Sequence, residues 1–221
     1  MVEKTLNTLQ YVIEKYQLRI GRHSPVEIPN MIRENLAELF GELGFTVGAE
    51  IGVLYGAFSK QICQKNPNLK LYCIDPYLAY DGFIPGPLDQ KAQDDIYEAC
   101  RETMAPYNHE FIRKTSVEAA KDFKDESLDF FYLDANHRFE HVVADLATWI
   151  PKVRSGGIIS GHDLHRMSLS TDTKNNPVHV LPALYGYTDA YRIHPWFAIG
   201  ERFIQPGGRR DKYRSWMWVK T

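Results

Sequence analysis

Hydrophobic positions recur with a helical period in the first forty or so residues and form short continuous runs after that. The period predicts two helices, at residues 3–18 and 30–43, the second with Asn30 as its N-cap and Gly44 after its end. The later runs predict buried strands, at 45–51, 70–74, 109–113, 128–133 and 156–160. Helical patterns lie between or after them, at 59–65, 88–104, from about 116, and 140–150.

This alternation of strands and helices predicts a parallel sheet with helices on both faces. The chain closes differently, with two aromatic runs at 196–199 and 215–219 that flank the turn sequence QPGG. They predict an antiparallel hairpin at one edge of the sheet. No repeat or linker interrupts the pattern. We therefore predict one α/β domain, residues 44–221, preceded by a helical extension, residues 1–43.

Charge and cysteine content narrow the classes of partner. The 221 residues hold 26 Lys and Arg against 28 Asp and Glu, a formal net charge of −2. Binders of nucleic acid or anionic membranes usually carry a basic excess, so we expect neither partner. We find no apolar run of about 18 residues and no secretory signal at the start. The 3 cysteines lack the CxxC spacing of a metal site, and we expect a reduced, cytoplasmic setting.

Four predicted strand ends carry an acidic residue, namely Glu50, Asp75, Asp134 and Asp163. In open α/β sheets ligands bind beyond the carboxyl ends of the strands, so these acids should share one edge. Converging carboxylates repel one another unless a cation or hydrogen-bond donors lie between them. The pattern therefore indicates a ligand that has positive charge or hydroxyl groups.

A glycine turn after the first of these strands refines the ligand. Gly52 and Gly56 allow a ligand to approach the backbone closely, but the spacing is neither GxGxxG nor GxxxxGK[ST]. Glu50 inside the strand end suits a cationic group. Asp75 at the next strand end can accept hydrogen bonds from both hydroxyls of a ribose. Together they indicate an adenosine-bearing ligand with little negative charge, although Asp75 before Pro76 is also an ordinary turn residue.

Four segments then carry a family resemblance. Residues 50–59 (EIGVLYGAFS) and 72–76 (YCIDP) resemble the first two motifs of class I S-adenosylmethionine-dependent methyltransferases. Residues 130–137 (FFYLDANH) and 151–163 (PKVRSGGIISGHD) resemble the motifs of their fourth and fifth strands. Within the class, the chain is most similar to small-molecule O-methyltransferases of the catechol and macrolide-sugar type. The resemblance implies a Rossmann-like fold whose seven-stranded, mostly parallel sheet has the order 3-2-1-4-5-7-6 and an antiparallel last strand.

The resemblance also implies roles for individual residues. The contacts of S-adenosylmethionine would come from Glu50, Gly52, Tyr55, Gly56, Ser59, Asp75, Ser116, Val117 and Asp134. A divalent metal, Mg²⁺ or similar, would be held by Asp134 with His162 and Asp163, and His137 would be the catalytic base. The pair His162-Asp163 replaces the Asp-Asn or Glu-Asp of relatives and is a softer donor set than Mg²⁺ prefers. For His137 and Ser116, a place at the start of a helix is the alternative.

The implied reaction is methyl transfer to a hydroxyl oxygen of a small molecule. A histidine titrates in the range that such a base needs, and a metal would lower the pKa of the hydroxyl further. Two alternatives remain open. One is a protein of the same fold that binds the cofactor without catalysis, suggested by the departure at His162. The other is a metal-dependent phosphoesterase that uses Asp134, His137, His162, Asp163 and His165, although the early Asp-x-His motif of that class is missing.

Aromatic side chains make up 13% of the chain. Three of them, Tyr77, Tyr80 and Phe83, lie in a loop rich in glycine and proline, which is typical of a lid over a bound substrate. We take them as candidate substrate contacts, with packing of the loop against the sheet as the equal alternative. The amphipathic first helix could pair with a second copy of the chain, and the oligomeric state is left open.

Overall fold

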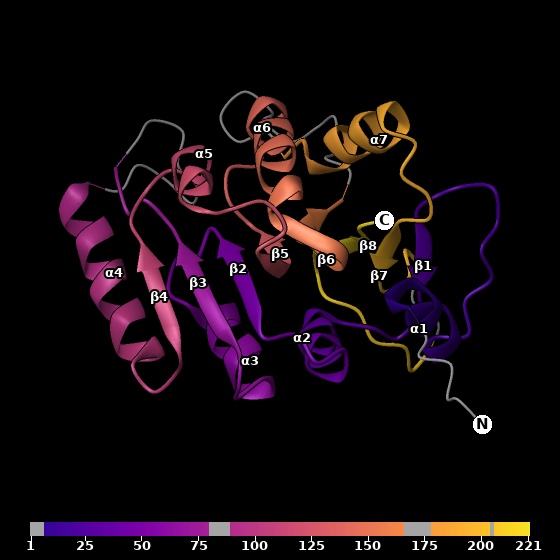
Figure 1. Ribbon diagram of the computed structural model, residues 1–221, viewed down its shortest axis with the longest axis horizontal. Coiled ribbons are helices and arrows are strands. Elements are labelled where there is room, and N and C mark those ends of the chain that lie inside the picture. Colours follow the sequence, from indigo (N-terminus) through magenta and orange to yellow (C-terminus); the bar gives the residue numbers. More distant parts are fainter. Residues whose placement is uncertain (1–6, 80–88, 166–177, 204–205) are drawn as a thin grey trace.

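The computed structural model describes residues 7–79, 89–165, 178–203 and 206–221. They form one 8-stranded sheet with helices packed against it (Figure 1). The order across the sheet is β1-β7-β8-β6-β5-β2-β3-β4. β8 runs antiparallel to both of its neighbours, and every other pair is parallel. The strands are β1 (Val26–Ile28), β2 (Val47–Ile51), β3 (Lys70–Ile74), β4 (His109–Ile112), β5 (Leu128–Leu133), β6 (Val153–Leu164), β7 (Phe197–Ile199) and β8 (Arg214–Val219).

This arrangement confirms the predicted order of the seven strands and the antiparallel direction of the last. The structure adds an eighth strand, β1, which pairs in parallel with β7 so that Val26 lies opposite Phe197. β1 has only 3 residues, too few for a period of hydrophobic positions to be visible. It lies inside the segment predicted as a helical extension, where the boundary at residue 43 stays a prediction.

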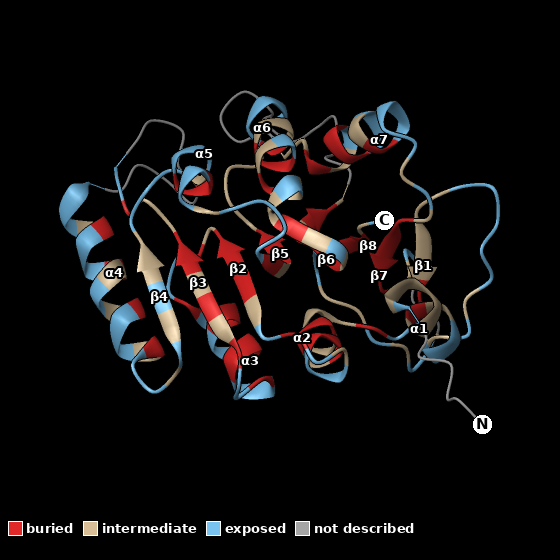
Figure 2. Cartoon of the chain, viewed as in Figure 1, coloured by how far each residue is buried: buried red, intermediate tan, exposed pale blue. Residues whose placement is uncertain are grey.

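Helices cover both faces of the sheet, as predicted. One layer holds α1 (Thr8–Lys15), α2 (Arg33–Glu42), α3 (Ala57–Lys65) and α4 (Gln90–Met104). The other holds α5 (Ser116–Ala119), α6 (Phe139–Trp149) and α7 (Val180–Ala190), with 3₁₀ turns at Ala120–Asp122 and Ile150–Lys152. Figure 2 shows that the buried side of these helices faces the sheet. Among the described residues, no helix is long and apolar enough to cross a membrane.

The central strand β5 shows why its sequence is continuously hydrophobic from Phe130 to Leu133. Phe130 and Tyr132 point into the core under α2 and α3, whereas Phe131 and Leu133 point into the core under α6. Successive side chains of a strand alternate between faces, so a strand covered on both sides needs an apolar residue at each position. Phe130 stacks on Phe40 of α2 with 3.8 Å between the ring centroids.

Two local expectations need correction. Asn30 is not the N-cap of the second helix, because α2 begins at Arg33, after Ile32. Asn30 has a left-handed backbone (φ 56°), and its side chain accepts a hydrogen bond from the backbone N–H of Arg209 instead. α7 was not predicted, since Pro182 and Gly186 within it are poor helix formers. Gly44 does end α2, with φ 68° and its N–H bound to the Gly41 carbonyl.

Candidate active site

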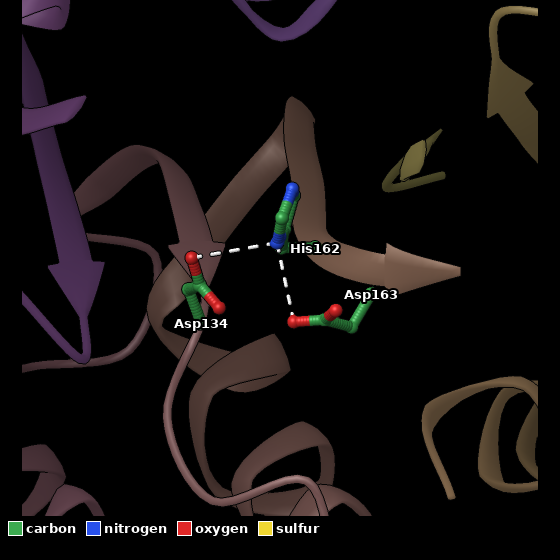
Figure 3. Close-up of side chains that lie close together, drawn as sticks. All are labelled: Asp134, His162 and Asp163. Atoms are coloured by element: carbon green, nitrogen blue, oxygen red, sulfur yellow. Dashed lines mark hydrogen bonds and ion pairs between the residues drawn. The ribbon is translucent and has the colours of Figure 1, made fainter. Parts of the chain in front are cut away.

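The carboxyl ends of β5 and β6 bring four predicted site residues together. Leu133 pairs with Gly161, so Asp134 after β5 lies beside His162 and Asp163 near the end of β6 (Figure 3). His137, on the turn into α6, has Nε2 at 3.3 Å from Asp134 Oδ1 and 3.2 Å from Asp163 Oδ2. Nδ1 of His162 lies 3.1 Å from Asp163 Oδ2 and 3.6 Å from Asp134 Oδ2. We call these four residues the Asp-His cluster.

Charge balance within the Asp-His cluster favours the ionised form of Asp163. Burial tends to raise the pKa of Asp163, but the hydrogen bond from His162 and the nearby His137 lower it below its usual value. Burial conversely tends to lower the pKa of His137, and the two carboxylates outweigh this and raise it. Asp163 has a left-handed backbone (φ 58°) where the register between β6 and β8 shifts, and this turns its carboxylate toward the histidines.

The chemistry of the Asp-His cluster fits a divalent metal. Asp134, His162 and Asp163 each offer one ligand atom, and these atoms lie within 4.8 Å of one another. Two carboxylate oxygens and one imidazole nitrogen suit Zn²⁺, Mn²⁺ or Fe²⁺ better than Mg²⁺, which prefers oxygen ligands alone. The three residues are the ones that the sequence predicted, and their role as ligands stays a prediction.

Arg33, the first residue of α2, is a site residue that sequence reasoning missed. Its Nη1 lies 3.6 Å from Asp134 Oδ2, and its guanidinium lies 4.6 Å from the centre of the Phe58 ring. Burial tends to lower the pKa of Arg33, but Tyr132 and Asp134 outweigh this and raise it, so the side chain stays charged. No signal in the sequence separates it from the other charged residues of an amphipathic helix.

On the other side of Asp134, the glycine turn between β2 and α3 approaches the backbone after β5. A Cβ atom on Gly52, whose φ is 87°, would lie 2.2 Å from the carbonyl oxygen of Asp134. Glu50 is buried below this turn and accepts a hydrogen bond from the hydroxyl of Ser59. Burial raises the pKa of Glu50 to about 8. The predicted cofactor residues of β2 and α3 therefore adjoin the Asp-His cluster.

Asp75 lies at the end of β3, as predicted, but most of its acceptor capacity is already used. Its Oδ2 accepts hydrogen bonds from the backbone N–H groups of Val53 (3.0 Å) and Leu54 (3.1 Å). Its Oδ1 accepts one from the N–H of Tyr77 at 2.9 Å. A carboxylate has about four acceptor positions, so one remains for a ribose hydroxyl. The turn role that the sequence left open is thus present, and the ribose-binding role of Asp75 stays a prediction.

Tyr77 was predicted as a substrate contact in an aromatic loop, but the structure places its side chain in the core. Only 1% of Tyr77 is exposed, and its ring packs on Tyr97 of α4 with 4.9 Å between centroids. Its hydroxyl donates to the carbonyl of Leu54 at 2.9 Å. Tyr77 therefore fixes the glycine turn to the core, which is the packing alternative that the sequence left open. Tyr80 and Phe83 lie outside the described residues.

The remaining cofactor candidates divide between exposed and buried positions. Tyr55 and Val117 are exposed, whereas Ser116 begins α5 and its hydroxyl accepts a hydrogen bond from Trp149 Nε1 at 2.9 Å. Thr115, not Ser116, is the N-cap of α5. The same hydroxyl binds Asp145 of α6, whose pKa burial raises to about 7. Sequence reasoning missed Asp145, although an acidic residue on the apolar stripe of a helix is a visible signal.

Comparison with solved structures shows that the fold of this chain is similar to the folds of O-methyltransferases. A putative O-methyltransferase from Klebsiella pneumoniae superposes with a TM-score of 0.60 at 15% identity, over 100% of this chain and 93% of that one. The O-methyltransferase from Bacillus cereus in complex with SAH gives 0.56 at 18% identity, over 99% and 94%. An O-methyltransferase family protein from Burkholderia thailandensis gives 0.57 at 16% identity over 85% of this chain, which spans only 55% of that protein. These identities establish the fold alone.

The family is established by sequence. The profile of a family described as a methyltransferase domain matches residues 49–164, more than half of the chain. The chain belongs to this methyltransferase domain family, which confirms the predicted kinship and the Rossmann-like fold. An uncharacterized protein of Sinorhizobium fredii, y4gI, is 38% identical over 52 residues; the match covers 24% of this chain and 6% of y4gI.

Proposed function

We propose that the chain is an S-adenosylmethionine-dependent methyltransferase that methylates a hydroxyl oxygen of a small molecule. One observation carries the proposal: Asp134 borders both the glycine turn, through Gly52, and the imidazole of His137. A cofactor in the turn and a hydroxyl beside His137 would therefore be neighbours. The known family and fold support the same activity.

In this proposal the residues of the chain do three things. Glu50 and Asp75 bind the cofactor, through its positive charge and its ribose. His137 takes the proton of the acceptor hydroxyl on Nδ1 as that oxygen forms its bond to the methyl carbon, because Nε2 already donates to the carboxylates of Asp134 and Asp163. Asp134 and Asp163 then stabilise the resulting imidazolium, since both carboxylates lie within 3.3 Å of Nε2.

When bound, the cofactor supplies a methyl group on a positively charged sulfur, which leaves as a neutral thioether. A divalent metal, where one is bound, would be held by Asp134, His162 and Asp163 and would lower the pKa of a coordinated hydroxyl. Holding the acceptor beside the methyl group contributes most of what remains, because a displacement needs its partners in line and in contact.

Titration calorimetry with S-adenosylmethionine and S-adenosylhomocysteine tests the cofactor. We expect both to bind, and Asp75→Asn to weaken binding about tenfold, because the amide NH₂ takes the place of an acceptor oxygen. Asp129→Asn is a matched control: Asp129 also accepts backbone hydrogen bonds, from Thr46 and Val47, but at the opposite end of the sheet. If the wild-type chain binds neither compound, the proposal is wrong.

Turnover separates an enzyme from a protein that only binds the cofactor. The purified chain is incubated with S-adenosylmethionine and a panel of hydroxylated small molecules, and formation of S-adenosylhomocysteine is followed. Methylation at oxygen, assigned by mass spectrometry of the product, supports the proposal. Methylation only at nitrogen or carbon acceptors would contradict its choice of acceptor.

A further inference from the structure

The segment that leads into α2 is built into the carboxyl end of the sheet. β1 runs parallel to β7, so residues 29–32 leave the sheet at the same edge as the Asp-His cluster. The backbone N–H of Arg33 donates to Asp211 Oδ2 at 2.6 Å, and the backbone N–H of Arg209 donates to the Asn30 side chain at 3.2 Å. A single distant segment, residues 209–211, thus fixes the start of α2, and with it the direction of the Arg33 side chain.

The guanidinium of Arg33 is held over the cluster. It lies 3.6 Å from Asp134 Oδ2 on one side and over the ring of Phe58 on the other. The Tyr132 hydroxyl contacts it from below, in the core. Among the described residues, the other groups paired with Asp134 or Asp163 are the histidines His137, His162 and His165. Arg33 is therefore the permanent positive charge of this site within the described parts of the chain.

The oxygen that Arg33 faces is also the oxygen that faces His162. Asp134 Oδ2 lies 3.6 Å from Arg33 Nη1 and 3.6 Å from His162 Nδ1. A metal held by both Asp134 and His162 would have to share the Asp134 carboxylate with Arg33. A divalent cation there would meet a fixed positive charge in a partly buried setting, where screening by solvent is weak.

We propose that Arg33 competes with a divalent cation for Asp134 and sets the metal affinity of the Asp-His cluster. The inference rests on the metal set named under the proposed function, and it deepens that function. With Arg33 in place, Asp134 already has a cationic partner, so the cluster binds a metal only weakly. Removal of the guanidinium frees the oxygen and removes the repulsion, and the same three ligands then bind the metal more tightly.

Metal titration of the full chain tests this directly. Mn²⁺ is added to wild-type protein and to Arg33→Gln, and binding is measured by calorimetry and by the electron paramagnetic resonance signal of free Mn²⁺. We expect the variant to bind at least tenfold more tightly, and Arg33→Lys, which keeps the charge, to stay within about threefold of the wild type. Arg101→Gln is the matched control: it makes the same change of charge on α4, where Arg101 pairs with Glu98.

Two further variants keep the result interpretable. Asp163→Asn in the Arg33→Gln background should abolish the gain, which assigns the binding to this cluster. Arg33→Met, which preserves an apolar stem over Phe58, replaces Arg33→Gln if that variant loses its fold by circular dichroism. Equal affinities of wild type and the Arg33 variants, or no binding by either, would overturn the proposal. The measurement uses neither cofactor nor acceptor, so its result is independent of whether methyl transfer is found.

Discussion

The two halves of the carboxyl edge treat their acidic residues in opposite ways. In the Asp-His cluster, the carboxylates of Asp134 and Asp163 face imidazole and guanidinium groups at 3.1–3.7 Å. On the side of the predicted cofactor residues (called the cofactor side below), Glu50 and Asp145 are buried and hydrogen-bond to the hydroxyls of Ser59 and Ser116. One half pairs its acids with cations, whereas the other surrounds them with neutral groups.

The pKa values follow this difference. Histidines lower the pKa of Asp163, whereas burial raises those of Glu50 to about 8 and Asp145 to about 7. Cation partners stabilise a carboxylate even where it is desolvated, but a hydroxyl alone does not offset the loss of water. We therefore expect the Asp-His cluster to be poised for proton transfer, and Glu50 to gain its missing partner only when a cationic ligand binds.

Removing His137 should have the largest effect, because it takes the base out of the half where charge is balanced. We expect His137→Ala to lower kcat for an accepted substrate by about 10²–10⁴-fold, the range typical of general base catalysis. Cofactor affinity should change by less than about threefold, since Glu50 and Asp75 are untouched. His141→Ala, at an exposed position one turn along α6, should leave kcat unchanged. If the His137 variant keeps its kcat, the Asp-His cluster does not supply the base, and the two halves do not differ in the way described.

The border between the halves depends on the close approach of Gly52 to Asp134. Gly52→Ala should cost about 3 kcal/mol or more of unfolding free energy, because a Cβ there overlaps the Asp134 carbonyl and φ is 87°. Gly44→Ala is the matched control, with φ 68° and no atom within 4 Å of its Cβ. It should cost only about 1 kcal/mol, from the backbone alone. Urea unfolding of both variants measures the difference, and equal costs would show that the border is loosely packed.

The same division explains what could be predicted from the sequence. The residues of the cofactor side lie close together along the chain, at a strand end, in the glycine turn after it and at the next strand end. The positions of Glu50, Gly52 and Asp75 could therefore be predicted, whereas the strand order came from the family resemblance; the order and the kinship are both confirmed. The grouping of Asp134, His162 and Asp163 also followed, because parallel neighbours end at one edge.

The misses come from contacts between distant segments. Arg33 reaches Asp134 only because β1 joins the sheet and Asp211 fixes the start of α2. Asp145 meets Ser116 across the contact between α5 and α6. Tyr77 is buried because α4 offers Tyr97 as a packing partner. Hydrophobic periodicity describes single elements, and none of these pairings is encoded in one element.

Asp145 should give the smallest effect of the three. It tests whether a buried carboxyl on the cofactor side is protonated in the folded chain. For Asp145 the folded pKa of about 7 lies above the ordinary value of 3.8 for an aspartate, so the folded chain binds a proton more tightly than the unfolded chain. Stability from the neutral carboxyl is fully present below pH about 4 and is lost progressively until the pH passes about 7. Asp145→Asn mimics the neutral form, so its free energy of unfolding should rise by about 2 kcal/mol relative to wild type as the pH increases from about 4.5 to 7.5. The pKa shift sets an upper limit of about 4 kcal/mol on this difference. Urea unfolding across this range measures the gain, with Glu140→Gln at an exposed site of α6 as the control; a gain independent of pH would show that Asp145 is ionised in the folded chain.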